Sequence, residues 1–388
     1  MSKVIIDLKA LKHNLSVIEE WMKGRGSQWS VVTKVLCGHA DTLKALQMLG
    51  VRSIGDSRLE NLRAIEHCIS GFEAWYLRLP HLSAAGDVVQ LADVSLNSEI
   101  SIIHALNDEA RRRNREHHII IMIELGDLRE GILPGHLVEF YRKVFELDCI
   151  DVLGIGANLG CLAGAVPNID QFMQLVLYRE LLELKFGRKL PLISAGSSAV
   201  LPLVLEEKLP KAINHFRIGE SIFLGSDLVN GGTLPGLRDD VILLQAEIAE
   251  IKEKSLLPMG ETSNIQPFET AQIEDEYTPG QRGYRALVTI GQLDTDVHGL
   301  QPCNPEYKIA GASSDISVIN LGDNPMNLRV GDEITFRVNY SALLRLMYGR
   351  YIEKETRPSL EEFSIFIGED THDIEPVTHN ITAIHQGA

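Results

Sequence analysis

Hydrophobic and polar positions follow one regular order over the first 232 residues. Short apolar runs rich in β-branched residues alternate with stretches that place apolar residues at helical spacing. A strand-like run at 4–7 and an amphipathic stretch at 8–22 come first. Eight further strand-like runs follow, separated by helix-like stretches, at 30–39, 51–54, 74–77, 93–96, 118–124, 152–159, 192–194 and 213–217.

Repeated strand–helix units with short connections are typical of a parallel sheet, and eight of them favour a (β/α)8 barrel. A doubly wound open sheet is the alternative. Such a sheet is expected to carry a GxGxxG phosphate-binding turn after its first strand, and the sequence has none there. The pattern therefore predicts an α/β protein with an N-terminal TIM-like barrel.

The pattern changes after residue 232. Strand-like runs now succeed one another with turn sequences between them, and a strong helical stretch returns only at 342–351. We therefore predict two domains, a barrel over residues 1–232 and a mostly β domain with a polar tail over residues 233–388. The long acidic stretch at 260–283 is expected to be a functional or mobile loop.

Composition excludes several classes of partner. The net charge of −16 would repel phosphate backbones, so nucleic acid is not expected to bind. No apolar run is long enough to span a bilayer, and no signal peptide is recognisable at the start. The five cysteines are odd in number and form no CxxC pair, which favours reduced thiols in a cytoplasmic protein and argues against a structural zinc site.

The run at 30–39 carries Lys34 among apolar residues. An ammonium taken out of water is costly, and desolvation favours the neutral amine, which can form a Schiff base with an aldehyde. The alternative is an ordinary strand-end lysine whose stem packs while its head reaches water. Taken alone, this stretch favours the alternative.

Other polar residues also follow strand-like runs, where a parallel barrel places its active site. They are Arg129, Asn158, Ser197 and Arg217. Each has a structural explanation by itself: an ion pair for Arg129, a turn for Asn158, a helix cap for Ser197, and a stem-packed position for Arg217. Their occurrence together at strand ends favours a shared site.

The residue types at these positions suit one cofactor. The segments Gly196-Ser197-Ser198 and Arg217-Ile218-Gly219-Glu220 offer backbone N–H groups to a phosphate at helix starts. A Schiff-base lysine on the first barrel strand would hold an aldehyde nearby. An aldehyde and a phosphate together are the reactive groups of pyridoxal phosphate.

Seven segments carry a further resemblance. They are Val32-Thr33-Lys34 with His39, Gly126-Asp127-Leu128-Arg129-Glu130-Gly131, Gly154-Ile155-Gly156-Ala157-Asn158, Ala195-Gly196-Ser197, Phe216-Arg217-Ile218-Gly219, Gly311-Ala312-Ser313-Ser314-Asp315 and Asn339-Tyr340. Their order and spacing resemble the alanine racemase family of pyridoxal-phosphate enzymes of fold type III, over nearly the whole chain. Within that family, the residues of these segments are most similar to the ornithine racemase, or broad amino-acid racemase, subgroup.

The resemblance implies roles for individual residues. Lys34 would hold the cofactor and exchange the Cα proton, and Arg129 would contact the substrate carboxylate. Asn158 stands where the family has a histidine beside the ring. Ser197 and Tyr340 would reach the phosphate. The resemblance also implies a head-to-tail homodimer in which the β domain of one chain covers the barrel mouth of the other.

The position of Arg217 bears on the reaction. The resemblance places it against the pyridine nitrogen, where a guanidinium cannot accept a proton and stays charged. The expected activity is therefore racemisation of an amino acid through an external aldimine. A decarboxylase of fold type III is the first alternative. It is expected to have an acid at this position, and Glu220 is nearby.

A non-catalytic pyridoxal-phosphate carrier is the second alternative, and it would lack the β domain. A metal-dependent barrel enzyme is the third, but the histidines show no metal-binding spacing.

The sequence departs from the family where the second proton-transferring group is expected. The family's partner-subunit tyrosine would fall within 262–268, which contains no tyrosine, and the family tyrosine near the lysine is replaced by Gly38.

Substrate choice is a separate hypothesis. Asp294 and Asp315 lie in segments that the resemblance places near the pocket, and they could pair with the cationic side chain of ornithine or lysine. They could equally be turn residues.

Overall fold

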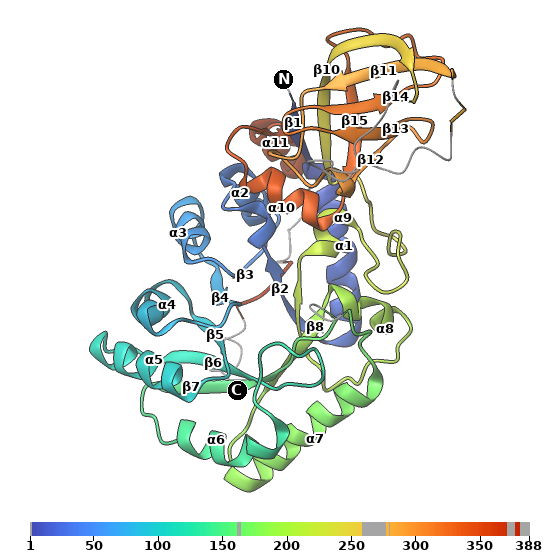
Figure 1. The fold of residues 1–388 in the computed structure, drawn as a ribbon. Helices are drawn as coiled ribbons and strands as arrows, with labels where there is room; N and C mark the ends of the chain where they lie inside the picture. Colours follow the sequence, from blue (N-terminus) through green and yellow to red (C-terminus); the bar gives the residue numbers. More distant parts are fainter. Residues whose placement is uncertain (1, 161–163, 258–276, 279, 371–376, 381–388) are drawn as a thin grey trace. The chain divides into compact units, whose positions relative to one another are not determined.

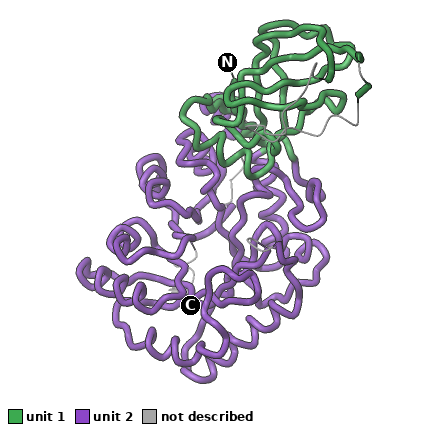
Figure 2. The backbone as a smooth tube through the Cα atoms, in the orientation of Figure 1, with its two compact units in different colours: residues 1–10, 239–359 green, residues 11–238, 360–388 purple. Residues whose placement is uncertain are grey.

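The computed structural model describes residues 2–160, 164–257, 277–278, 280–370 and 377–380. Contacts within the chain divide it into two compact units, coloured separately in Figure 2. We call residues 11–238 with 360–388 the barrel unit, and residues 1–10 with 239–359 the β unit. The two units are described separately below.

The barrel unit contains a closed barrel of eight parallel strands (Figure 1). In order they are β2 (Gln28–Val32), β3 (Ser53–Asp56), β4 (Glu73–Tyr76), β5 (Val94–Asn97), β6 (His117–Met122), β7 (Ile150–Gly156), β8 (Leu192–Ser197) and β9 (His215–Ile218). The last strand pairs in parallel with the first, with Gln28 opposite His215 and Val31 opposite Ile218. The predicted (β/α)8 barrel is thereby confirmed.

Helices connect the strands and lie outside the barrel (Figure 1). They are α1 (Leu8–Arg25), α2 (Ala40–Met48), α3 (Leu59–Cys68), α4 (Ala85–Leu91), α5 (Ile100–Arg112), α6 (Leu137–Val144), α7 (Ile169–Phe186), α8 (Leu201–Leu205) and α9 (Glu220–Leu224). Helix α7 has clear boundary signals. A capping box joins Asn168 and Gln171 at its start, and Gly187 adopts the left-handed conformation at its end.

Apolar side chains of neighbouring strands fill the barrel. One buried cluster comprises Trp75, Val94, Leu96, Ile120, Met122, Leu153 and Leu192. Polar residues are buried beside this cluster, among them His117 and His215, which are fully covered. A buried polar group is costly unless it is hydrogen-bonded, so these histidines must have partners within the barrel.

The β unit is a mostly antiparallel sheet of eight strands. The strands are β1 (Lys3–Asp7), β10 (Ile242–Ser255), β11 (Arg282–Val288), β12 (Leu300–Pro302), β13 (Lys308–Ala312), β14 (Ser317–Asn320), β15 (Glu333–Val338) and β16 (Glu353–Arg357). One helix, α10 (Tyr340–Tyr348), follows β15. The predicted mostly β second domain is therefore present.

The structure assigns the two chain ends differently from the sequence-based boundary at residue 232. Strand β1 pairs with β10 and β16, so the N-terminal strand belongs to the β unit. Helix α11 (Leu360–Asp370) belongs to the barrel unit, where Phe363 is fully buried. Residue Val377 then donates its backbone N–H to Gly50 O at 3.0 Å. Contacts with residues far away in the sequence decide to which unit each chain end belongs, and the local hydrophobic pattern does not reveal these contacts.

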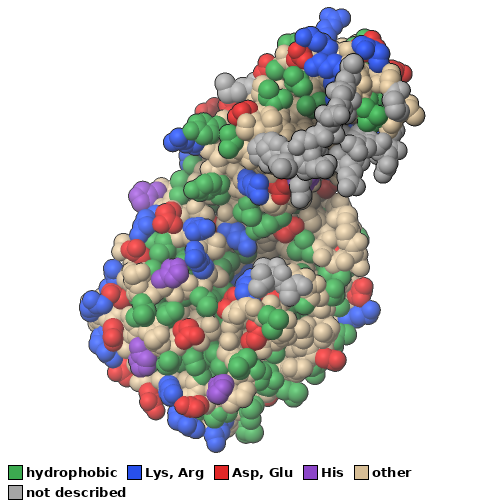
Figure 3. All heavy atoms as spheres, in the orientation of Figure 1, with side chains coloured by type: hydrophobic (Ala, Val, Ile, Leu, Met, Phe, Trp, Pro, Cys, Tyr) green, Lys and Arg blue, Asp and Glu red, His purple; other side chains and the backbone are tan. Residues whose placement is uncertain are grey.

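Over the barrel unit, acidic and basic side chains are interspersed on the face drawn in Figure 3. Among the described residues, no helix combines the length and the apolar character needed to cross a membrane.

Candidate active site

Lys34 lies just beyond the end of β2. The sequence predicted one strand containing the lysine, and this prediction is wrong, because β2 ends at Val32 and Lys34 begins the 3-10 turn Lys34–Leu36. Thr33 still donates its N–H to Gly55 O of β3 at 2.9 Å, whereas Leu36 N donates back to Thr33 O at 2.8 Å. The half-buried Lys34 therefore follows the carboxyl end of the first barrel strand.

A buried carboxyl group fixes the residue before the lysine. Thr33 Oγ1 donates to Asp56 Oδ2 at 3.0 Å, and Asp56 Oδ1 accepts from Arg58 N and Asn61 Nδ2. Burial raises the pKa of Asp56, although these hydrogen bonds act in the opposite direction. Sequence reasoning missed Asp56. The available signal was an acid at the end of an apolar run.

Arg217 is buried in the barrel, which rules out the stem-packed rim position. Its Nη1 donates to Ser194 O at 2.6 Å and also to Ser194 Oγ. Its Nη2 donates to Ala157 O at 3.0 Å and to Asn158 Oδ1 at 2.7 Å. The guanidinium is thus held by acceptors from β8 and from the segment after β7.

A chain of polar contacts continues from Asn158 to Arg129. Asn158 Nδ2 donates to Glu130 Oε1, and the Arg129 side chain donates to both oxygens of Glu130. Burial opposes ionisation of Glu130, but the hydrogen bond and charge of Arg129 prevail and lower its pKa. The hydrogen bonds thus link Arg217, Asn158 and Arg129, which the sequence selected, and Glu130 joins the last two. Sequence reasoning considered Glu130 only as an ion-pair partner of Arg129.

Close backbone packing surrounds Ser197. Its Oγ is buried and has no hydrogen-bond partner within the described part of the chain. A Cβ on Gly196 would lie 1.9 Å from Phe216 Cδ1, and one on Gly219 would lie 2.9 Å from Val32 O. The ends of β8, β9 and β2 therefore require glycine at these two positions, and they leave one buried hydroxyl with unused hydrogen-bonding capacity.

Glu220 is the acid beside the lysine. It begins α9 directly after Gly219 and is half-buried. Burial raises its pKa to about 7, and the charge of Lys34 acts to lower it. Lys34 and Glu220 each follow one of two adjacent strands, because β2 pairs with β9.

The remaining predicted residues lie in the β unit, where Asp294 and Asp315 have local partners. Asp294 Oδ2 accepts from Gly291 N at 3.0 Å, and Asp315 Oδ2 accepts from Ser314 Oγ at 2.6 Å. Tyr340 begins α10 after the N-cap residue Asn339. The stretch 262–268, where the family tyrosine is missing, lies outside the described residues.

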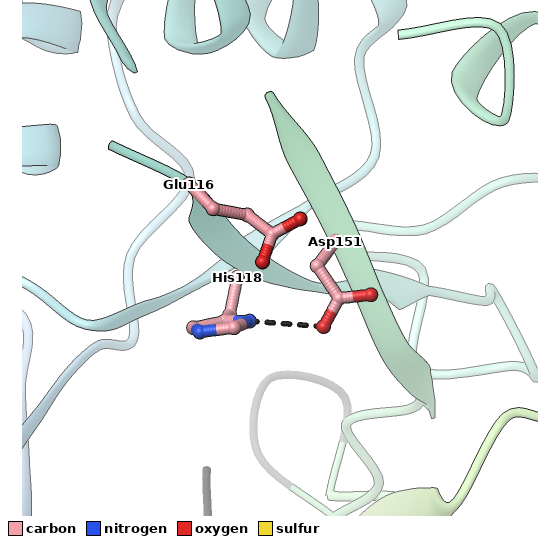
Figure 4. Close-up of side chains that lie close together, drawn as sticks. All are labelled: Glu116, His118 and Asp151. Carbon is pink, nitrogen blue, oxygen red and sulfur yellow. Dashed lines mark hydrogen bonds and ion pairs between the residues drawn. The ribbon is translucent and has the colours of Figure 1, made fainter. Parts of the chain in front are cut away.

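A separate group of titratable side chains comprises Glu116, His118 and Asp151, whose ligand atoms lie within 4.8 Å of one another (Figure 4). His118 Nδ1 and Asp151 Oδ2 are 3.0 Å apart, and although burial opposes it, this partner raises the pKa of His118. These residues are at the amino ends of β6 and β7, opposite to the end that Lys34 follows.

The sequence is similar to those of known racemases. The family model for the alanine racemase N-terminal domain matches residues 6–227. An ornithine racemase of Acetoanaerobium sticklandii is 36% identical over 354 residues, which cover 91% of this chain and 99% of the relative. A lysine racemase of Thermotoga maritima is 31% identical over 360 residues, covering 92% of this chain and 99% of the relative.

Solved structures support the same fold. An alanine racemase from Streptomyces coelicolor A3(2) superposes with a TM-score of 0.70 at 18% identity, covering 92% of this chain and 98% of that one. One from Bartonella henselae with covalently bound pyridoxal phosphate gives 0.68 at 13% identity, covering 92% and 99%. The match to the family model and the identity to the two curated racemases show that the chain belongs to the alanine racemase family.

Proposed function

We propose that this protein is a pyridoxal-phosphate-dependent racemase that interconverts the L and D forms of a basic amino acid such as ornithine or lysine. The observation that carries the proposal is the polar chain Arg217–Asn158–Glu130–Arg129, which runs from the buried Arg217 to the exposed Arg129 at the barrel end that Lys34 follows. The ornithine and lysine racemases among the relatives support the choice of substrate class.

The residues present fit pyridoxal phosphate. Ser197 supplies a buried hydroxyl without a partner among the described residues, and Gly196 and Gly219 let the backbone come close. In this assignment Lys34 would bind the aldehyde, while the Ser197 and Tyr340 hydroxyls and the backbone N–H groups of Gly219 and Glu220 would hold the phosphate. Arg217 and Asn158 would hold the pyridine ring, Arg217 on the side of its nitrogen. When bound, the cofactor acidifies the Cα–H bond of an amino acid by delocalising the electron pair left behind.

Lys34 and Arg129 then act on the substrate. The Lys34 amine would exchange the Cα proton on one face of the substrate, and the Arg129 guanidinium would bind the carboxylate. Inversion also requires a second group that exchanges a proton on the opposite face. Arg129 is half-exposed and already faces Glu130, so the substrate carboxylate competes with a carboxylate that the structure holds in place.

Arg217 favours racemisation over the alternative reactions. Its donors are committed to Ser194, Ala157 and Asn158, and a guanidinium does not give up a proton at any relevant pH. An acid in this position would suit decarboxylation. Arg217 therefore disfavours the decarboxylase alternative, and the presence of the β unit disfavours a non-catalytic carrier.

The remaining assignments belong to the same proposal. Asp294 and Asp315 recognise the second ammonium group of the substrate, and two chains form a head-to-tail homodimer. The four described cysteines are free thiols, which fits a cytoplasmic protein.

A substrate panel tests the proposal. The purified protein with pyridoxal phosphate is incubated with single enantiomers of ornithine, lysine, alanine and serine in deuterated water. We expect both enantiomers to appear with deuterium at Cα, and ornithine or lysine to react at least about tenfold faster than alanine. Release of CO2, or equal rates across the panel, would contradict the proposal.

A further inference from the structure

The hydrogen bonds of Arg217 do not end at Ser194 but continue through the barrel core. Ser194 Oγ lies 2.7 Å from His215 Nδ1, and His215 Nε2 lies 3.2 Å from Ser30 Oγ. Ser30 Oγ in turn lies 2.7 Å from Ser53 Oγ. The path joins strands β9, β8, β2 and β3, and the side chains of Ser30, Ser53, Ser194 and His215 are fully buried.

Arg217 sets the direction of this path. A guanidinium only donates hydrogen bonds, so Ser194 Oγ accepts from Arg217 and must give its own hydrogen to another group. That group is His215 Nδ1, which is therefore unprotonated. The ring proton then resides on Nε2 and is donated to Ser30 Oγ, which donates to Ser53 Oγ. His215 is consequently neutral and in a single tautomer.

The imidazole is also fixed in position by packing. Its ring stacks on Trp75, with centroids 4.4 Å apart and an angle of 23° between the planes. A rigid ring that accepts from Ser194 orients the Ser194 hydroxyl, and that hydroxyl orients Arg217 Nη1. The arrangement connects the centre of the barrel to the residue assigned to the cofactor nitrogen.

We propose that His215, acting through Ser194, is a positioning residue that holds the Arg217 guanidinium in its place in the barrel. This inference deepens the proposed function and rests on it for its catalytic consequence. Nothing in the sequence indicates it, because His215 and Ser194 become neighbours only when β8 and β9 pair.

The barrel contains a matched control. His117 is also fully buried, and its Nε2 lies 2.8 Å from Ser95 Oγ. Ser95 Oγ accepts from Asn97 Nδ2 of the same strand, so the hydrogen bonds of this pair lead along β5. Ser95→Ala therefore removes a buried serine–histidine hydrogen bond of the same kind as Ser194→Ala does, away from the Ser194–Arg217 contact.

The first test reads the histidine directly and does not depend on activity. The full chain is labelled with ¹⁵N in its histidines, and the His215 signals are assigned with His215→Phe. We expect the wild type to show one neutral tautomer with the proton on Nε2. Ser194→Ala should give a mixture of tautomers at His215, whereas Ser95→Ala should leave His215 unchanged. A proton on Nδ1 in the wild type, or a doubly protonated ring, overturns the proposal even if Ser194→Ala does not fold.

The second test reads Arg217 through kinetics. Ser194→Ala should lower kcat about 10- to 100-fold with KM changed less than about threefold, because the placement of Arg217 and not substrate binding is disturbed. Ser194→Thr, which keeps the hydroxyl, should recover most of the loss, and Ser95→Ala should stay within about twofold of wild type. Equal losses in Ser194→Ala and Ser95→Ala would overturn the positioning role. A wild-type protein inactive on every amino acid would instead refute the proposed function and leave the tautomer result standing.

Discussion

Single residues of this site owe their properties to neighbours that lie far apart in the sequence. Lys34, Arg129, Asn158, Ser197 and Arg217 were selected from the sequence because each lies within or just after a recognisable apolar run. Their connecting residues were not. Glu130 joins Asn158 to Arg129 only once the loop after β6 lies against the end of β7, and no local signal marks that contact.

Glu220 gives a pH-dependent prediction. Its pKa rises from an ordinary 4.5 to about 7 in the folded protein, so the folded state holds the proton more tightly than the unfolded chain. Its contribution to stability therefore falls as the pH rises from 4.5 to 7 and is constant above that range. Glu220→Gln removes this loss, which is at most about 3 kcal/mol. We expect the variant to gain stability relative to wild type between pH 4.5 and pH 8 in urea unfolding of the cofactor-free protein.

An exposed glutamate provides the opposite control. The hydrogen bond and charge of Lys143 lower the pKa of Glu139, so Glu139→Gln should lose stability relative to wild type above pH 5, or change little. If the difference in stability between Glu220→Gln and wild type were the same at pH 4.5 and at pH 8, the raised pKa of Glu220 would be refuted.

Secondary-structure elements were predictable in kind and order, but their ends were not. The eight barrel strands appear where the apolar runs predict them, since the alternation of runs reports burial directly. The end of β2 was misjudged because Val35 and Leu36 continue the apolar pattern, although they belong to a 3-10 turn. Tertiary hydrogen bonds to β3 and the turn itself decide where that strand stops.

The junction of β8 and β9 gives a prediction at this scale. Gly196→Ala would place a Cβ 1.9 Å from Phe216 Cδ1, so the two strands must separate beside Arg217. We expect a loss of about 2–4 kcal/mol in the free energy of unfolding, measured by urea denaturation. Phe216→Ala is itself costly because Phe216 is fully buried, but Gly196→Ala should cost less in a Phe216→Ala background than in wild type.

Gly24 in α1 is the control for this substitution. A Cβ added there meets nothing within 4 Å, and Gly24→Ala should stabilise the helix by about 0.5–1 kcal/mol. If Gly196→Ala and Gly24→Ala changed stability alike, close packing at the β8–β9 junction would be refuted.

At the scale of the whole molecule, each chain end belongs to a different unit from the one that the sequence pattern suggested. The N-terminal strand completes the sheet of the β unit, and the residues after 360 complete the barrel unit. The fold class was nevertheless predictable, because the change in pattern near residue 232 is local. Pairings across more than 200 residues leave no trace in a local pattern.

The C-terminal segment gives a prediction at this scale. Thr378 is buried, and its Oγ1 accepts from Arg52 N at 2.7 Å and from Ser53 N at 2.8 Å. Thr378→Val leaves both N–H groups without this acceptor and should cost about 2–4 kcal/mol in urea unfolding. Thr378→Ser keeps the hydroxyl and should cost less than about 1 kcal/mol. Equal stability of the two variants would show that the hydroxyl does not hold the segment to the barrel.

The most direct measurement concerns the attachment of the cofactor. The holoprotein is reduced with borohydride and digested, and the pyridoxyl mass is located among the peptides. We expect the label on Lys34 alone, loss of labelling in Lys34→Ala, and loss of racemisation with it. A label on another lysine, or full racemase activity in Lys34→Ala, would refute the role of Lys34.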